Sequence, residues 1–148
     1  MRDFFIGFNR YLLKQFVIEQ RATFKKEEKL KSRKLIEIIF KQGISFSNFP
    51  FRILYLFLEE NIVPLQSGFA VSGKHFKKAV DRNRIKRLMR EAYRLQKSSL
   101  TSTLKNKGKF MTVFFIYNGK ELPEYNDVDE KLKSALKRLN KIVDEATS

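Results

Sequence analysis

Basic side chains are concentrated between residues 82 and 94, where six Lys and Arg residues occupy thirteen positions. An α-helix turns by about 100° per residue, so an i, i+4 spacing aligns four of them in one row with two polar neighbours beside it. The row is Arg82, Lys86, Arg90 and Arg94, and the neighbours are Asn83 and Arg87. Like charges at this spacing repel each other and destabilise the helix. We therefore predict a polyanionic partner, and a phosphate backbone fits best.

Acidic residues are scarce near this row. Asp81 and Glu91 are the only acids between Lys74 and Arg94, against nine bases. A surface that serves solubility alone normally mixes the two signs. A basic stripe on one face of a helix favours nucleic-acid binding. A solvated helix face is the alternative interpretation.

The opposite side of the same helix is apolar, which lets it pack on a core. Its predicted core residues have helical spacing, and they are Ile85, Leu88, Met89, Ala92 and Leu95. We expect the helix to begin near Lys78.

The overall composition describes one strongly basic domain. The chain of 148 residues has a formal net charge of +15, and its 43% hydrophobic content with fifteen phenylalanines is sufficient for a compact core. Residues 74–94 carry a net +7, whereas residues 120–148 hold six bases and seven acids. Charge of this size concerns partners more than fold, and its uneven distribution predicts a defined docking surface.

Cysteine is absent and His75 is the only histidine. The sequence therefore offers no disulfide framework, no thiolate or histidine-cluster metal site, and little basis for Ser/His or Cys/His catalysis. A chain without disulfides fits a reducing cytoplasm, where we expect this protein to act.

The first 23 residues are predicted to form an extension ahead of a domain spanning residues 24–148. Large apolar side chains dominate residues 4–18, but Arg10, Lys14 and Glu19 interrupt them, so they do not make a transmembrane helix. No small-x-small cleavage site of a signal peptide follows. We expect an amphipathic extension, with a membrane-surface anchor as the alternative.

The remaining elements predict an α+β fold. Ser32 is a good N-cap for a helix through Phe40 that Gly43 ends. Strands are predicted within residues 44–60, where apolar side chains alternate, and again over residues 67–72 and 110–117. We interpret residues 98–109, which are rich in Ser, Thr, Asn, Lys and Gly, as a polar loop.

The last predicted element is a helix in which Asp127 and Glu130 have the spacing of a capping box. One face of this helix is apolar, comprising Val128, Leu132, Ala135, Leu136, Leu139 and Val143. The order is helix, two or three strands, helix, strand, helix. This order predicts a small mixed sheet with helices packed on it.

The run from Ala79 to Arg94 (AVDRNRIKRLMREAYR) resembles the protein subunit of bacterial ribonuclease P. Three further motifs fit the family's order: Lys29-Leu30-Lys31, Phe40-Lys41-x-Gly43 and Val71-Ser72-x-Lys74. The similarity covers about residues 24–145. It implies the family's α-β-β-β-α-β-α order, with an unusual left-handed βαβ crossover around the basic helix.

The resemblance also implies a role in tRNA 5′ maturation. In this family the RNA subunit carries the catalytic centre and the Mg²⁺ ions, so no catalytic residue and no cofactor are expected in the protein alone. The protein binds the catalytic RNA and holds the single-stranded 5′ leader of precursor tRNA in a cleft between the first helix and the sheet. Aromatic platforms and phosphate-binding cations suit such a substrate. No DNA partner is expected.

By resemblance, the RNA-binding residues are Lys74, Arg82, Asn83, Arg84, Lys86, Arg87 and Arg90. We add Lys77, Lys78 and Arg94 to this predicted set because of their positive charge. The leader cleft is expected to include Phe40, Tyr55 and Ile36. Core packing is the alternative for Phe40 and Tyr55. Arg84 falls away from the basic row on a helical wheel, so a bracing role in the fold is its alternative.

The chain departs from the family pattern at two places. Gly73 replaces the first lysine of a Ser-Lys-Lys stretch, and Phe76-Lys77-Lys78 replaces the usual Gly-Asn with one residue added. Ile36 stands where the family has a phenylalanine facing the cleft. Lys77 and Lys78 can restore the lost charge, whereas Ile36 weakens stacking.

Two other classes of function remain open at this point. A structural ribosomal-type RNA-binding protein would share the charge and the small α+β fold, but it would not assist cleavage. A membrane-surface protein would use residues 1–18 to bind anionic vesicles.

Overall fold

The computed structural model describes residues 23–146. The extension predicted over residues 1–23 lies outside the described residues except for Thr23, and so does the alternative membrane anchor over residues 1–18. Within residues 23–146, no helix is long and apolar enough to cross a membrane.

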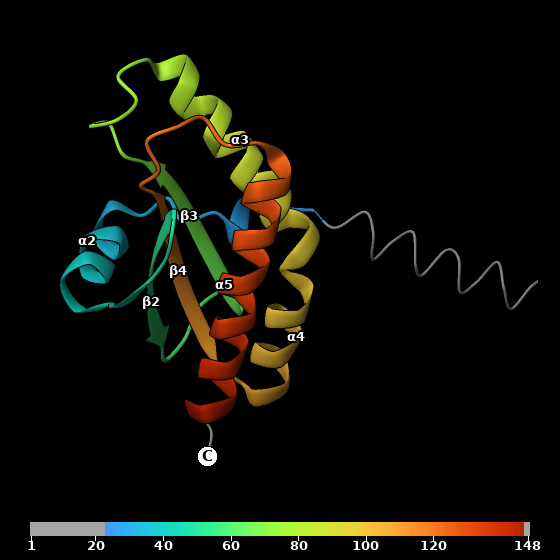
Figure 1. Cartoon of the computed structure of the whole chain (residues 1–148). Helices are drawn as coiled ribbons and strands as arrows, with labels where there is room; N and C mark the ends of the chain where they lie inside the picture. The colour runs from blue at the N-terminus through green and yellow to red at the C-terminus, as the bar shows by residue number, and fades with distance from the viewer. Residues whose placement is uncertain (1–22, 147–148) are drawn as a thin grey trace, which may run out of the picture.

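Four strands form one mixed sheet (Figure 1), and helices flank both of its faces. In chain order the elements are the 3₁₀ helix η1 (Lys26–Glu28), α2 (Arg33–Gln42), β1 (Ile44–Asn48), β2 (Phe51–Leu58), β3 (Leu65–Val71), α3 (Ala79–Gln96), α4 (Ser98–Lys107), β4 (Phe110–Tyr117) and α5 (Tyr125–Ala146). The strands lie in the order β1-β2-β4-β3, in which only β3 and β4 are parallel. The predicted mixed α+β architecture is confirmed.

The two ends of α2 follow the predicted local signals. The Ser32 hydroxyl accepts a hydrogen bond from the backbone N–H of Leu35 at 3.3 Å, which satisfies one free donor of the first turn. At the other end, a Cβ on Gly43 would lie 2.3 Å from the carbonyl oxygen of Ile39. The helix ends there because the Gly43 backbone becomes extended, at a ψ of 150°, and only glycine allows the close approach that results.

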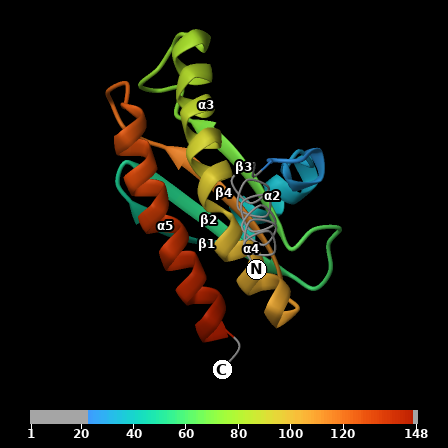
Figure 2. The same cartoon turned by 90° about the vertical axis from the view of Figure 1, so that its right-hand side faces the viewer.

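The connection from β3 to β4 runs through α3 and α4 on one side of the sheet. With these helices in front of the sheet in Figure 2, β3 runs up the page and β4 lies to its left. The crossover is therefore left-handed, as the resemblance implied. Crossovers between parallel strands are right-handed in about 98% of cases, so this topology is distinctive.

The larger core lies between the sheet and the three helices α3, α4 and α5. All six residues predicted for the apolar face of α5 are buried in it. A smaller core lies on the other face, where α2 packs over Leu54 and Phe114. The strand residues alternate between these two cores because successive side chains of a strand point to opposite faces.

The interpretation of residues 98–109 as a loop is wrong, because Ser98–Lys107 is the helix α4. Its Ser, Thr and Asn residues are weak helix formers, but Leu100 and Leu104, one turn apart, are buried in the larger core. Tertiary packing outweighs the local preference. Gly108 then ends the helix at a φ of 64°, a left-handed conformation that suits glycine.

The predicted capping box of the last helix is also wrong. Helix α5 begins at Tyr125, so Asp127 lies inside its first turn instead of capping it. A carboxylate in the first turn still interacts favourably with the helix dipole. Asp127 therefore marks the N-terminal end of α5 correctly, although it does not cap the helix.

Candidate nucleic-acid interface

Helix α3 packs on the sheet through a stripe of buried residues. This stripe comprises Ile85, Met89, Ala92 and Tyr93, with Leu88 partly buried. The prediction that Leu95 belongs to it is wrong, since that side chain is 47% exposed. Tyr93, one turn after Met89, takes the buried position, and its hydroxyl oxygen accepts a hydrogen bond from the buried Ser67 hydroxyl at 2.6 Å. Burial raises the pKa of Tyr93, so it stays neutral.

Arg82, at the start of the basic row, stabilises the loop before the helix. Its guanidinium donates hydrogen bonds of 2.8 Å to the carbonyl oxygens of Phe76 and Lys77. These bonds cross-link the loop that leads from β3 into α3. The side chain is only half-exposed, so part of its donor capacity serves the fold.

Arg94, at the other end of the row, forms an ion pair with Glu91. The shortest distance between its guanidinium and the carboxylate is 2.6 Å, and the Nε–H donates a second bond at 3.1 Å. The hydrogen bond from Arg94 is the main cause of a lowered pKa at Glu91. The pair partly neutralises Arg94.

The four cations between these ends are Arg84, Lys86, Arg87 and Arg90. None of these four side chains takes part in a hydrogen bond or ion pair within residues 23–146. Arg84, Arg87 and Arg90 are exposed together with Asn83, and Lys86 is half-exposed. Within residues 23–146, the exposed Arg84 side chain has no hydrogen bond or ion pair that would support its alternative bracing role. These unpaired like charges raise the energy of the free protein, and a bound polyanion would offset that cost.

The altered loop between β3 and α3 keeps its basic side chains in solvent. Lys74, Lys77 and Lys78 are all exposed. Phe76 instead points inward, 6% exposed, with its ring 6.0 Å from that of Tyr117. The buried Phe76 ring thus anchors the longer loop on the core. The three lysines extend the cationic surface beyond the helix.

A groove lies on the other flank of α3, between this helix and α2. The groove has a volume of about 210 Å³. Its lining comprises Phe24, Lys29, Leu30, Lys31, Ile36, Ser67, Gly68, Phe69, Arg90 and Phe114. We call this set the basic groove. A Cβ on Gly68 would lie 2.8 Å from the Phe114 ring, so glycine allows that ring to lie across β3. Three cations and three phenylalanines therefore share one depression.

The structure separates the three residues predicted for the leader cleft. Ile36 lines the basic groove, and Phe40 is 50% exposed with its ring edge against Phe114 at 5.4 Å. Tyr55 does not join them, because it is 7% exposed and belongs to the larger core on the opposite face of the sheet. The predicted place of Tyr55 beside Phe40 is wrong.

Sequence reasoning missed Phe114 and Phe24 as groove residues. Leu54, not Tyr55, lies opposite Phe114 in the β2–β4 register. The alternation in residues 51–58 carried this signal, since Tyr55 shares its parity with the core residues Phe51 and Ile53. No periodic signal marked Phe24, which precedes the first helix.

The arrangement is suited to binding, since its side chains present positive charge and aromatic surface. Arginines bind phosphates through charge-assisted hydrogen bonds, and exposed rings stack with unpaired bases. Within residues 23–146, no group of three or more His, Asp or Glu side chains is placed to hold a metal ion.

Comparison with known proteins agrees with this geometry. The family model described as Ribonuclease P matches residues 24–140. The ribonuclease P protein component of Porphyromonas gingivalis strain W83 is 36% identical over 115 residues, which cover 77% of this chain and 84% of that protein. The corresponding protein of Clostridium botulinum strain Loch Maree is 33% identical over 114 residues, covering 76% and 95%.

Solved structures show the same fold. The RNase P protein of Thermotoga maritima superimposes with a TM-score of 0.57 at 31% identity, covering 75% of this chain and 96% of that one. The Staphylococcus aureus RNase P protein gives a TM-score of 0.63 at 25% identity, covering 76% and 95%. These relatives do not favour a ribosomal-type protein. The chain therefore belongs to the ribonuclease P protein family: it is the protein component of an endoribonuclease holoenzyme, and its partner in that holoenzyme is the ribonuclease P RNA.

Proposed function

We propose that this chain binds its RNA partner through the unpaired cations of α3 and holds the 5′ leader of precursor tRNA in the basic groove. The observation that carries the proposal is that the side chains of Arg84, Lys86, Arg87 and Arg90 have no ion pair or hydrogen bond within residues 23–146. Lys74, Lys77 and Lys78 extend the same cationic surface.

The groove supports the second half of the proposal. Arg90 belongs both to the cationic helix and to the lining of the groove, so the surface for the RNA subunit and the groove for the leader adjoin each other. Phe40, half-exposed at the edge of α2, offers a ring to an unstacked base. Stacking of this kind contributes about 1–3 kcal/mol per base with little sequence preference.

The division of labour follows from the side chains. The protein supplies cations and aromatic surfaces, and we expect the RNA subunit to supply the catalytic centre together with bound Mg²⁺. The protein would then assist cleavage by positioning the leader and screening phosphate repulsion.

The test is cleavage of precursor tRNA by a bacterial ribonuclease P RNA at low Mg²⁺, with and without this protein. We expect strong stimulation and cleavage at the mature 5′ end. No stimulation would contradict the proposal, even if the protein bound the RNA.

The contribution of the α3 cations is measured by the salt dependence of RNA binding. Arg87→Ala and Arg90→Ala should each weaken binding and lower the slope of log K against log salt by about 0.9 per lost phosphate contact. Lys141→Ala on α5, which also removes one exposed positive charge, is the matched control and should leave the slope unchanged. Equal slopes in all variants would show that α3 does not face the RNA.

A further inference from the structure

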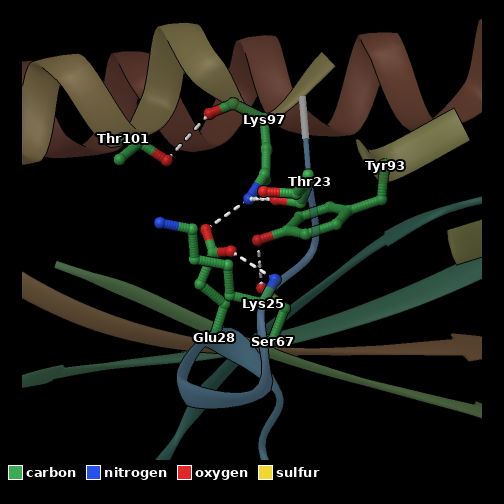
Figure 3. A network of polar contacts seen from close by, with 7 residues as sticks. All are labelled: Thr23, Lys25, Glu28, Ser67, Tyr93, Lys97 and Thr101. Carbon is green, nitrogen blue, oxygen red and sulfur yellow. Dashed lines mark hydrogen bonds and ion pairs between the residues drawn. The ribbon is translucent and has the colours of Figure 1, made fainter. Parts of the chain in front are cut away.

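A buried ion pair joins the N-terminal segment of the described chain to the junction of α3 and α4. Lys97 lies between the two helices and is only 7% exposed. Its ammonium group donates to the Glu28 carboxylate and, at 2.6 Å, to the carbonyl oxygen of Thr23 (Figure 3). Both side chains are largely removed from water, at 9% and 16% exposure. Buried pairs of this kind are costly to break.

The Glu28 carboxylate has a second contact in the same network. One of its oxygens accepts a hydrogen bond from the backbone N–H of Lys25 at 2.7 Å, which closes the turn of η1 (Figure 3). The same carboxylate therefore stabilises the turn at residues 25–28 and attaches that turn to the junction of α3 and α4.

Phe24 extends the effect of this pair to the groove. The Lys97 ammonium lies 5.7 Å from the centre of the Phe24 ring, and the Lys29 ammonium lies 5.7 Å from it as well. The ring itself packs edge-on against Tyr93 and Phe69, at 5.3 and 5.9 Å. Lys29 is one of the cations that line the basic groove.

The strand edge alone does not provide this attachment. Residues 27–30 bind along β3, where the Leu30 N–H donates to the Ser67 carbonyl at 2.9 Å and the Gln66 amide donates to the Glu27 carbonyl at 3.0 Å. These bonds fix the backbone near Leu30 but do not reach residues 23–25. The contacts of Lys97 connect that part of the segment to the helices.

We propose that Glu28 and Lys97 are positioning residues for the leader. Their pair holds the Phe24 ring in place beneath the Lys29 ammonium, while the Lys29 backbone is fixed on β3, so that this cation stays in the wall of the basic groove. Neither residue lines the groove, so neither needs to touch RNA. This inference rests on the proposed leader-binding role of the groove.

The proposal makes a prediction opposite to that of simple electrostatics. Glu28→Ala raises the net charge of the protein by one, so a purely electrostatic effect would strengthen RNA binding. Loss of positioning would weaken it instead. We expect holoenzyme assembled with Glu28→Ala to bind precursor tRNA about fivefold more weakly, with a salt slope lower by about 0.7 for one lost single-strand phosphate contact. Affinity for mature tRNA should not change.

Two further variants grade and control this effect. Glu28→Gln keeps an oxygen that can accept from Lys97, so its loss of precursor affinity should be intermediate. Asp144→Ala removes a carboxylate that pairs with Lys107 at 3.0 Å between α4 and α5, and it changes the net charge equally. It should not weaken precursor binding.

Thermal unfolding of each variant separates positioning from global stability, because binding is measured well below the melting temperature. An equal loss of affinity for precursor and mature tRNA would overturn the proposal, as would unchanged or stronger precursor binding by Glu28→Ala. Lys31→Ala, which removes an exposed groove cation that does not lie on α3, is measured in parallel and separates failure of the positioning role from failure of leader binding by the groove. If it weakens precursor binding and Glu28→Ala does not, only the positioning role fails. If neither variant has an effect, the groove does not bind the leader.

Discussion

Within residues 23–146, the helices α3, α4 and α5 cover one face of the sheet, whereas the ten-residue helix α2 covers part of the other. On the first face, Phe115 is fully buried and stacks on Phe69 at 5.4 Å. On the second face, Phe40 keeps half of its surface in solvent although its ring contacts Phe114. The same residue type therefore serves stability on one face and is available to a ligand on the other.

The difference follows from how much helix each face receives. Helices α3, α4 and α5 together bury a continuous core, and burial of apolar area is the main stabilising term of the fold. Within residues 23–146, helix α2 covers only part of the second face, and the basic groove lies along the β3 edge between α2 and α3. Rings near this edge therefore stay accessible to a ligand.

We call the face covered by α3, α4 and α5 the closed face, and the face that carries α2 the open face. The largest expected effect concerns the closed face. Phe115→Ala removes a fully buried ring and should lower the free energy of unfolding by about 3–5 kcal/mol, as measured by urea denaturation. Phe115→Leu should lose less, which keeps the test usable if the alanine variant does not fold. A loss below about 1 kcal/mol for Phe115→Ala would mean that this face is not the stabilising one.

The matched change on the open face is Phe40→Ala. Its half-exposed ring should contribute about 1 kcal/mol or less to stability, mainly through the edge contact with Phe114. Affinity of the holoenzyme for precursor tRNA should fall by about 1–3 kcal/mol, with little change for mature tRNA. Direct binding measurements with both RNAs check this. Equal losses for the two RNAs would indicate that Phe40 acts through the fold, as Phe115 does.

A smaller effect is expected at the polar contact inside the closed face. Tyr93→Phe leaves the buried Ser67 hydroxyl without its partner and should cost about 1 kcal/mol. The double variant with Ser67→Ala should recover part of this loss, because no polar group is then left unsatisfied. A double-mutant cycle in urea denaturation measures the coupling. Strictly additive losses would show that the 2.6 Å contact contributes nothing.

The smallest effect concerns the exposed side of α3. Glu91→Gln removes the ion pair with Arg94, which should contribute only about 0.3–0.5 kcal/mol because both side chains are partly solvated. The pKa of Glu91 lies below its usual 4.5, so the contribution is present above pH 4.5 and is lost as the pH falls through the folded-state pKa. Stability of the variant and the parent should therefore converge in acid. A difference that persists at pH 2 would require another cause.

Local patterns were sufficient where each residue's role depends on its own neighbours along the chain. The 3.6-residue spacing predicted the buried residues of α5 without error, and the Ser32 and Gly43 signals placed both ends of α2. The polar composition of residues 98–109 gave the wrong element, because the burial of Leu100 and Leu104 against distant helices decides it. The face occupied by Tyr55 required the sheet register, which places Leu54 against Phe114.

The sequence by itself determined that this chain is a basic α+β protein of the ribonuclease P family with a cationic helix near its middle. Those properties depend on residue types and on spacings within single helices and strands, so they can be predicted without knowing how the elements pack. Only the tertiary structure decided which cations within residues 23–146 pair with another side chain, because Lys97 pairs with Glu28, 69 positions away. That contact depends on how distant segments pack together, and no local spacing encodes it.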